Sequence, residues 1–242
     1  MNQLGFTLPR ETMANWIIYV AENYFYPIYE RLHEELLKRD LVHADETTCQ
    51  VLREKGRTAE QTSYMWLYTT GSDALTPIVL YDYQPSRKGS CAQNFLEGFR
   101  GLVQCDGYQG YNKLGKAVNY AQNHHDTLMN YLLDGRCEIS NNRAERKAKS
   151  YAIGRKAFLF HTSEIGAGAS EVMYSIVETA KANNLNIFQY LYTVLLYMPD
   201  YMNSSAGIEQ LMPWSEFIKE QCSGLIDVES NVPEKRNPLP HR

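Results

Sequence analysis

Between residues 41 and 106 strand-like and helix-like patterns follow one another in an order that few folds accommodate. Three runs rich in β-branched and aromatic residues are divided by turn-forming or charged residues, as is typical of strands: 41–52, 63–71 and 77–84. The stretch 91–101 then has Phe95, Leu96 and Phe99 in helical register, and the short apolar run 102–106 follows it. We therefore expect an antiparallel meander of three strands joined by a crossover helix to a fourth strand, in an α/β fold.

Helical patterns flank this region on both sides. In 12–39 apolar residues recur every four positions, which predicts a long helix or two, kinked or split at Pro27 and used for packing or dimerisation. The residues of this stripe are Trp16, Val20, Tyr24, Ile28, Leu32 and Leu36.

After the fourth strand, 117–122 is a candidate fifth strand and 127–135 a helical stretch. A helix is expected from near Asn142, followed by an apolar run at 151–160 and a glycine-rich turn at 165–170. Two more helices are predicted, an amphipathic one at 170–184 and another near 187–198.

These patterns divide the chain into four parts. We expect an N-terminal helical segment (1–40), a catalytic core (41–182), a C-terminal helical segment (183–222) and a disordered tail (223–242). The end of the chain is polar and proline-rich, and such a composition cannot bury enough surface to offset the entropy of ordering.

Three short acidic segments place one carboxylate each in a different setting. Asp45 lies inside the first strand, on the same face as His43, Thr47 and Cys49, while Asp106 ends the fourth strand before Gly107. Glu145 opens the later helix. Each carboxylate also has an ordinary structural interpretation: Asp45 can face solvent or pair with a nearby Arg or Lys, and Asp106 can be a turn residue. Glu145 can form a capping box with Asn142.

Taken together, three such carboxylates form a plausible Mg²⁺ site, because this ion prefers carboxylate oxygens and water. Two such ions about 4 Å apart activate an attacking water or 3′-hydroxyl and stabilise the leaving oxygen of a phosphodiester. Mn²⁺ is an expected substitute.

A basic segment surrounds Glu145. Six positive residues lie between 143 and 156 with Glu145 as the only acid, in a chain whose net charge is −4. Such a concentration at a helix N-terminus favours contact with a phosphate backbone, the alternative being a solvated face. The candidate DNA contacts are Arg143, Arg146, Lys147, Lys149, Arg155 and Lys156.

Other chemistries receive little support. The five cysteines are scattered with no Cys-x-x-Cys pair, so we expect them to be reduced and structural. His124 and His125 are interpreted as surface residues, and the glycine-rich segment lacks the ending of a phosphate-binding P-loop. No run spans a bilayer and the start lacks a signal-peptide pattern, which predicts a cytoplasmic protein without membrane contact.

The sequence resembles the IS-sixty-six family of bacterial insertion-sequence transposases. The resemblance rests on HADET (43–47), LVQCDGYQGYN (102–112) and the long block 134–160, and it continues through 168–191 and LMPW (211–214). It implies a DDE transposase with a ribonuclease H-like mixed sheet core, flanked by helices. It also implies that Asp45, Asp106 and Glu145 are the catalytic metal ligands. The implied reaction is Mg²⁺-dependent cleavage of transposon ends and strand transfer by the freed 3′-hydroxyl, with terminal repeats and target DNA as partners in an oligomeric synaptic complex.

Two departures from the family pattern define the competing hypotheses. We expect the chain to begin after most of the family's zinc-binding and helix-turn-helix extension, and to lack a basic block between Asp106 and Glu145. One alternative is therefore an inactive remnant that binds DNA or oligomerises with a full-length transposase. Another is a generic metal-dependent nuclease that needs no terminal repeats.

Overall fold

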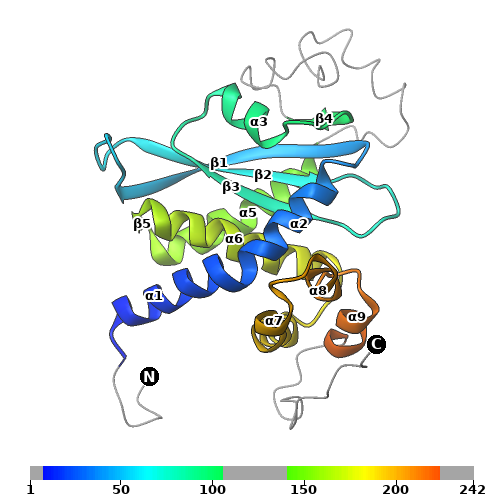
Figure 1. The fold of residues 1–242 in the computed structure, drawn as a ribbon. Coiled ribbons are helices and arrows are strands. Elements are labelled where there is room, and N and C mark those ends of the chain that lie inside the picture. The colour runs from blue at the N-terminus through cyan, green and yellow to red at the C-terminus, as the bar shows by residue number, and fades with distance from the viewer. Residues whose placement is uncertain (1–7, 106–140, 224–242) are drawn as a thin grey trace, which may run out of the picture.

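The computed structural model describes residues 8–105 and 141–223, which form a five-stranded mixed sheet with helices packed around it (Figure 1). The strands are β1 (Leu41–Arg53), β2 (Thr62–Thr70), β3 (Val79–Gln84), β4 (Leu102–Gln104) and β5 (His161–Ser163). Their order is β3-β2-β1-β4, with β1 to β3 antiparallel and β4 parallel to β1 after the crossover helix α3 (Gly89–Phe95). The predicted meander, crossover and ribonuclease H-like strand arrangement are confirmed. The candidate strand 117–122 lies outside the described residues.

Alternation along the strands divides the core in two. Val42 and Ala44 of β1 belong to the larger apolar cluster with Trp66 and Tyr68, whereas Cys49 belongs to a second cluster with Met65, Leu67, Tyr81 and Tyr151. The second cluster lies under α5 (Asn142–Phe158), the helix that carries Glu145. The predicted two faces of β1 are therefore both covered, by different helices.

The helix α6 (Glu164–Ala182) closes the outer edge of the sheet at β3. Its side chains accept hydrogen bonds from backbone N–H groups of β3: Thr179 from Val79 (3.0 Å), Ser175 from Tyr81 (2.8 Å) and Glu171 from Tyr83 (2.9 Å). An edge strand otherwise exposes unpaired N–H groups that invite pairing with another chain. Here a helix occupies that edge.

The prediction of a glycine-rich turn at 165–170 is wrong, because these residues form the first turns of α6. The Ser163 hydroxyl caps this helix by accepting from the Gly166 N–H (3.2 Å), and Ala167 and Ala169 are buried. A good cap and small buried residues outweigh the low helix propensity of the glycines. Most of the apolar run 151–160 is likewise the second half of α5, which ends at Phe158.

The N-terminal helix is split, as Pro27 predicts. α1 (Arg10–Val20) and α2 (Tyr26–Leu36) are joined by a π-helical turn η1 (Ala21–Phe25), and Pro27 lies in the first turn of α2. The wider turn shifts the phase of the four-residue stripe. Ile28, Leu32 and Leu36 are buried as predicted, but Trp16 is 55% exposed and α1 has no buried residue.

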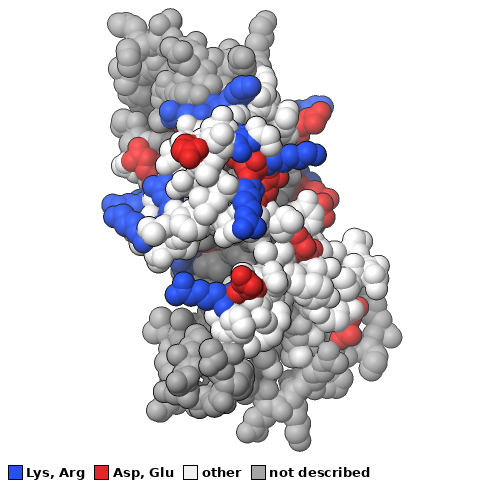
Figure 2. Space-filling model, turned by 90° about the vertical axis from the view of Figure 1, so that its left-hand side faces the viewer, with Lys and Arg blue, Asp and Glu red and all other residues white. Residues whose placement is uncertain are grey.

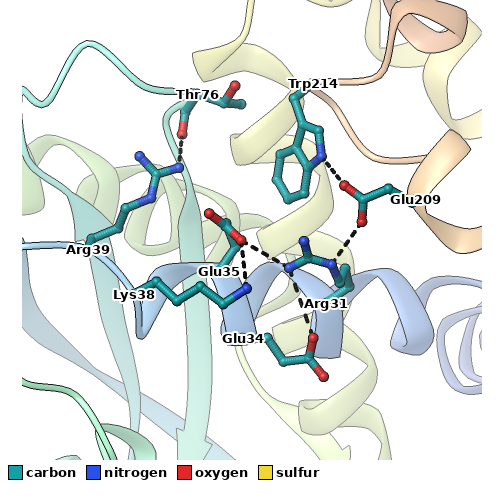
Figure 3. A network of polar contacts seen from close by, with 8 residues as sticks. All are labelled: Arg31, Glu34, Glu35, Lys38, Arg39, Thr76, Glu209 and Trp214. Carbon is teal, nitrogen blue, oxygen red and sulfur yellow. Dashed lines mark hydrogen bonds and ion pairs between the residues drawn. The ribbon is translucent and has the colours of Figure 1, made fainter. Parts of the chain in front are cut away.

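Three C-terminal helices, α7 (Ile187–Tyr201), α8 (Ser205–Gln210) and α9 (Glu216–Cys222), pack against one another, and α7 also contacts η1 and α6. Figure 3 shows the polar contacts that fasten them. The Arg31 guanidinium of α2 donates to Glu209 (2.9 Å) and lies over the Trp214 ring, while Glu35 accepts from Arg31 and Lys38. Of the described residues, no helix is long and apolar enough to cross a membrane.

Candidate active site

The candidate site lies on the edge of β1 that faces away from β2. β4 pairs with this edge at Leu41–His43 and β5 pairs with it again from Val51. Between these two pairings, residues 44–50 pair with β2 on their other edge, and no described strand pairs with them on this one. Two side chains from the α5 region bond to the intervening carbonyls. Asn141 Nδ2 donates to the Ala44 carbonyl (2.9 Å), and Arg155 Nη1 donates to the Thr48 carbonyl and to Thr48 Oγ1. The helix is thereby attached to β1 on both sides of Asp45 and Glu46.

Asn141, which the sequence interpretation did not single out, begins α5. It is the N-cap residue, it is buried, and its side chain bonds to β1 instead of capping its own helix. In a capping box the glutamate is the third residue after the N-cap residue, whereas Glu145 is the fourth residue after Asn141. The capping-box alternative for Asn142 and Glu145 is therefore wrong, and the first turn of α5 presents Glu145 at an exposed position.

Asp45 and Glu145 line one open pocket between β1 and α5, with a volume of about 590 Å³. Its lining residues are Asp45, Glu46, Thr47, Asn142, Glu145, Arg146, Ala148, Lys149 and Ala152. Asp45 is half-buried, and its Oδ1 accepts a hydrogen bond from the Glu46 N–H (2.8 Å). Two acids that are 100 positions apart in the sequence therefore face the same solvent-filled space.

The third predicted ligand, Asp106, lies outside the described residues, as do His124 and His125. β4 ends at Gln104, which is paired with His43, two residues before Asp45, and Asp106 follows Cys105 in the sequence. Within 8–105 and 141–223 no three His, Cys, Asp or Glu side chains are gathered closely enough to hold a metal ion. The pocket supplies two oxygen donors of the type that Mg²⁺ prefers, which fits a site with one further acid.

The six predicted DNA contacts fall into two groups. Three are engaged within the protein: Lys147 pairs with the buried Glu178 (3.1 Å), Arg155 bonds to Thr48, and Arg143 donates to Ser72 Oγ. The others are exposed, with Arg146 and Lys149 lining the pocket and Lys156 further along α5.

A second pair of carboxylates, which sequence reasoning missed, lies near the β3 edge. Asp82 of β3 is buried, and its pKa is raised to about 7 by burial. Glu171 of α6 is half-buried; burial and then the charge of Asp82 raise its pKa to about 8. The pattern offered one signal, since Asp82 interrupts the apolar run 78–81. These acids lie apart from the pocket, because cross-strand pairing places Asp82 beside Trp66, on the other face from Asp45.

The sequence matches the model described as Transposase IS66 family over residues 1–116 and 112–169, and the IS66 C-terminal element over residues 175–214. The chain belongs to the IS66 family of transposases. The first match is in two segments that overlap at residues 112–116.

Its relatives include three uncharacterized proteins of Sinorhizobium fredii (strain NBRC 101917 / NGR234). Protein y4qI is 21% identical over 311 residues, covering 87% of this chain and 57% of the relative. Protein y4jD is 31% identical over 102 residues (42% and 20%), and y4hP is 33% identical over 84 residues (35% and 15%). The chain thus spans little more than half the length of y4qI. No solved structure matches it.

Proposed function

We propose that this IS66 family chain cuts and joins DNA at insertion-sequence ends, with Asp45, Asp106 and Glu145 as the acids that hold Mg²⁺. The observation that carries the proposal is the shared pocket: the N-terminal turn of α5 brings Glu145 to the β1 edge beside Asp45. Mg²⁺, or Mn²⁺ in its place, would supply charge neutralisation and an activated water or 3′-hydroxyl at the phosphodiester. Terminal repeats and target DNA would be the partners, bound by an oligomer.

The protein's own groups have separable tasks in this reaction. Asp45 is on a strand whose backbone is paired with β2, so the main chain that carries its carboxylate is held in a fixed place. Glu145 is on a helix attached to the same strand by Asn141 and Arg155. Arg146 and Lys149, which line the pocket, would bind phosphate oxygens and orient the DNA strand.

The test is metal-dependent nicking of DNA that carries the element's terminal repeats. Asp45→Asn, Asp106→Asn and Glu145→Gln are each expected to lower the rate by at least about a hundredfold, since each removes one ligand charge. Glu216→Gln is the matched control, because the Glu216 side chain is 84% exposed on α9. Full activity in all three ligand variants would refute the assignment, and equal cutting of DNA without the repeats would indicate a generic nuclease.

An inactive chain that binds DNA or associates with a longer transposase is the second candidate function. It is favoured by the y4qI alignment, in which 311 aligned positions exceed the 242 residues of this chain, so that the relative carries internal residues with no counterpart here. This candidate predicts DNA binding without nicking. It also predicts that adding the chain to an active longer relative lowers the relative's transposition rate.

A further inference from the structure

The residues after α5 form a strained turn that presents two apolar side chains to solvent. Leu159 has φ 64° and ψ −51°, and the Phe160 N–H donates to the Phe158 carbonyl (2.8 Å). A γ-turn with positive φ is rare and is costly for a bulky side chain. The Leu159 side chain is nevertheless 65% exposed and Phe160 is 42% exposed.

Buried contacts hold the turn in place on both sides. Phe158 packs against His161 (ring centroids 4.9 Å apart) and against Tyr151 (6.0 Å). The Tyr151 hydroxyl and His161 Nε2 share a hydrogen bond of 2.8 Å, and burial lowers the pKa of His161 to about 4, so its ring is neutral at pH 7. Only Leu159 and Phe160 lie between these anchors. The turn is therefore a rigid projection, and we call Leu159 and Phe160 the apolar tip.

Basic residues surround the apolar tip. The outer face of α5 continues from the candidate pocket to the tip through exposed Lys149, Ile153 and Lys156, at helical spacing. Arg53 and Lys55, at the end of β1 next to β5, are also exposed. Two acids lie beside them: Glu54, which is buried and pairs with Arg57, and the exposed Glu164, which accepts from the Lys55 N–H (2.5 Å). Figure 2 shows this side of the molecule, where Lys and Arg side chains lie around uncharged surface with some Asp and Glu side chains among them.

We propose that the apolar tip inserts between bases of DNA that lies along the outer face of α5. The proposal rests on the proposed function only for its ligand, DNA. Basic side chains with an exposed aromatic between them match a polyanion with stacked rings, because cations bind the phosphates and apolar side chains wedge into base steps. An apolar protein surface would not complement the exposed Lys156, Arg53 and Lys55 near the tip. The helix rises about 20 Å from Glu145 to Phe158, the length of roughly six base pairs, so that pocket and tip can contact one duplex.

The experiment measures DNA affinity in EDTA, where no cleavage occurs. Two 20-base-pair duplexes are compared by fluorescence anisotropy, one fully paired and one with two adjacent mismatched pairs at its centre. A wedge gains from bases that are already unstacked, so the wild-type chain is expected to bind the mismatched duplex about tenfold more tightly. Leu159→Ala combined with Phe160→Ala should abolish this preference and leave the salt dependence unchanged, because the phosphate contacts remain.

Two control variants distinguish insertion of the apolar tip from the loss of any exposed aromatic side chain and from the loss of a phosphate contact. Phe188→Ala removes an aromatic side chain of similar exposure (56%) on α7 and should retain the tenfold preference. Lys156→Gln should weaken binding to both duplexes equally and reduce the salt slope by about one. A preference that survives in the double variant, or a wild-type chain that binds both duplexes equally or neither, would overturn the proposal.

The outcomes also separate the wedge from catalysis. A chain that prefers mismatched DNA but never nicks would refute the proposed reaction and support insertion of the apolar tip between bases. A chain that nicks in a metal-dependent way but shows no preference would refute the wedge alone. Asp45→Asn is expected to leave the preference intact.

Discussion

Replacing Glu171 by glutamine is expected to stabilise the protein above pH 7. In the folded chain Glu171 and Asp82 have pKa values raised to about 8 and about 7, mainly by burial, whereas both ionise near pH 4 when unfolded. The folded state therefore binds more protons between pH 5 and 7, and its free energy of unfolding falls as the pH rises through that window. Above about pH 8 both carboxylates are charged in either state and this dependence ends.

The size of the effect follows from proton counting. Each proton that the pair retains and the unfolded chain has released lowers the free energy of unfolding by about 1.4 kcal/mol per pH unit, so the fall from pH 5 to 7 is about 3 kcal/mol for one retained proton and about twice that for two. Glutamine keeps the oxygen that accepts from the Tyr83 N–H and adds a donor toward the Asp82 carboxylate. Glu171→Gln should therefore flatten the profile and exceed the wild type by about 1 to 3 kcal/mol at pH 8.

The assay is urea unfolding followed by circular dichroism at one-unit intervals from pH 5 to 9. Glu178→Gln is the matched control, since Glu178 lies two turns along α6 but pairs with Lys147 and Lys181. It should destabilise the protein, because it leaves those ammonium groups without their partner. A wild-type stability that rises from pH 5 to 8, or a Glu171→Gln profile parallel to the wild type, would refute the reasoning.

Three further variants test the site and its supports. Asn141→Ala should lower the free energy of unfolding in urea by about 1 to 3 kcal/mol, because it leaves the Ala44 carbonyl of β1 buried without a donor. It should also weaken Mn²⁺ binding, measured by electron paramagnetic resonance. An unchanged free energy of unfolding together with unchanged Mn²⁺ affinity would contradict the anchoring role. Gly101→Ala should lower stability by about 1 to 3 kcal/mol in thermal unfolding, because a Cβ there would collide with the Asp40 carbonyl. Gly168→Ala, with open space around it, should be neutral or stabilising by up to about 1 kcal/mol. Leu159→Gly should relieve the positive φ and raise stability by about 1 kcal/mol, and a lower melting temperature would argue against strain at that turn.

The sheet could be predicted from the sequence because its strands obey a simple rule. Alternation along 41–52 separates Val42 and Ala44 from Asp45 and Cys49, and the structure packs those two sets against different helices. Aromatic and β-branched runs similarly locate β2 and β3. The placement of Asp45 and Glu145 in one pocket agrees with the same order of elements.

The errors arose where a few side-chain contacts override local pattern. The glycines at 166 and 168 are helical because Ser163 caps α6 and the neighbouring alanines are buried. The stripe beginning at Trp16 loses its phase at a π-helical turn that no periodicity reveals. Asn141 could not be recognised because its partner, the Ala44 carbonyl, is a backbone group almost a hundred residues away.

The two attachments of α5 to β1 also bear on how such a chain tolerates insertions and deletions. Asn141 and Arg155 set the position of Glu145 relative to Asp45 through contacts made on the helix side of the connection 106–140. The geometry of the two acids therefore does not require that connection to have a particular length. Relatives can gain or lose segments there without rebuilding the pocket, and the same position suits the insertion of a reporter domain or an additional DNA-recognition module.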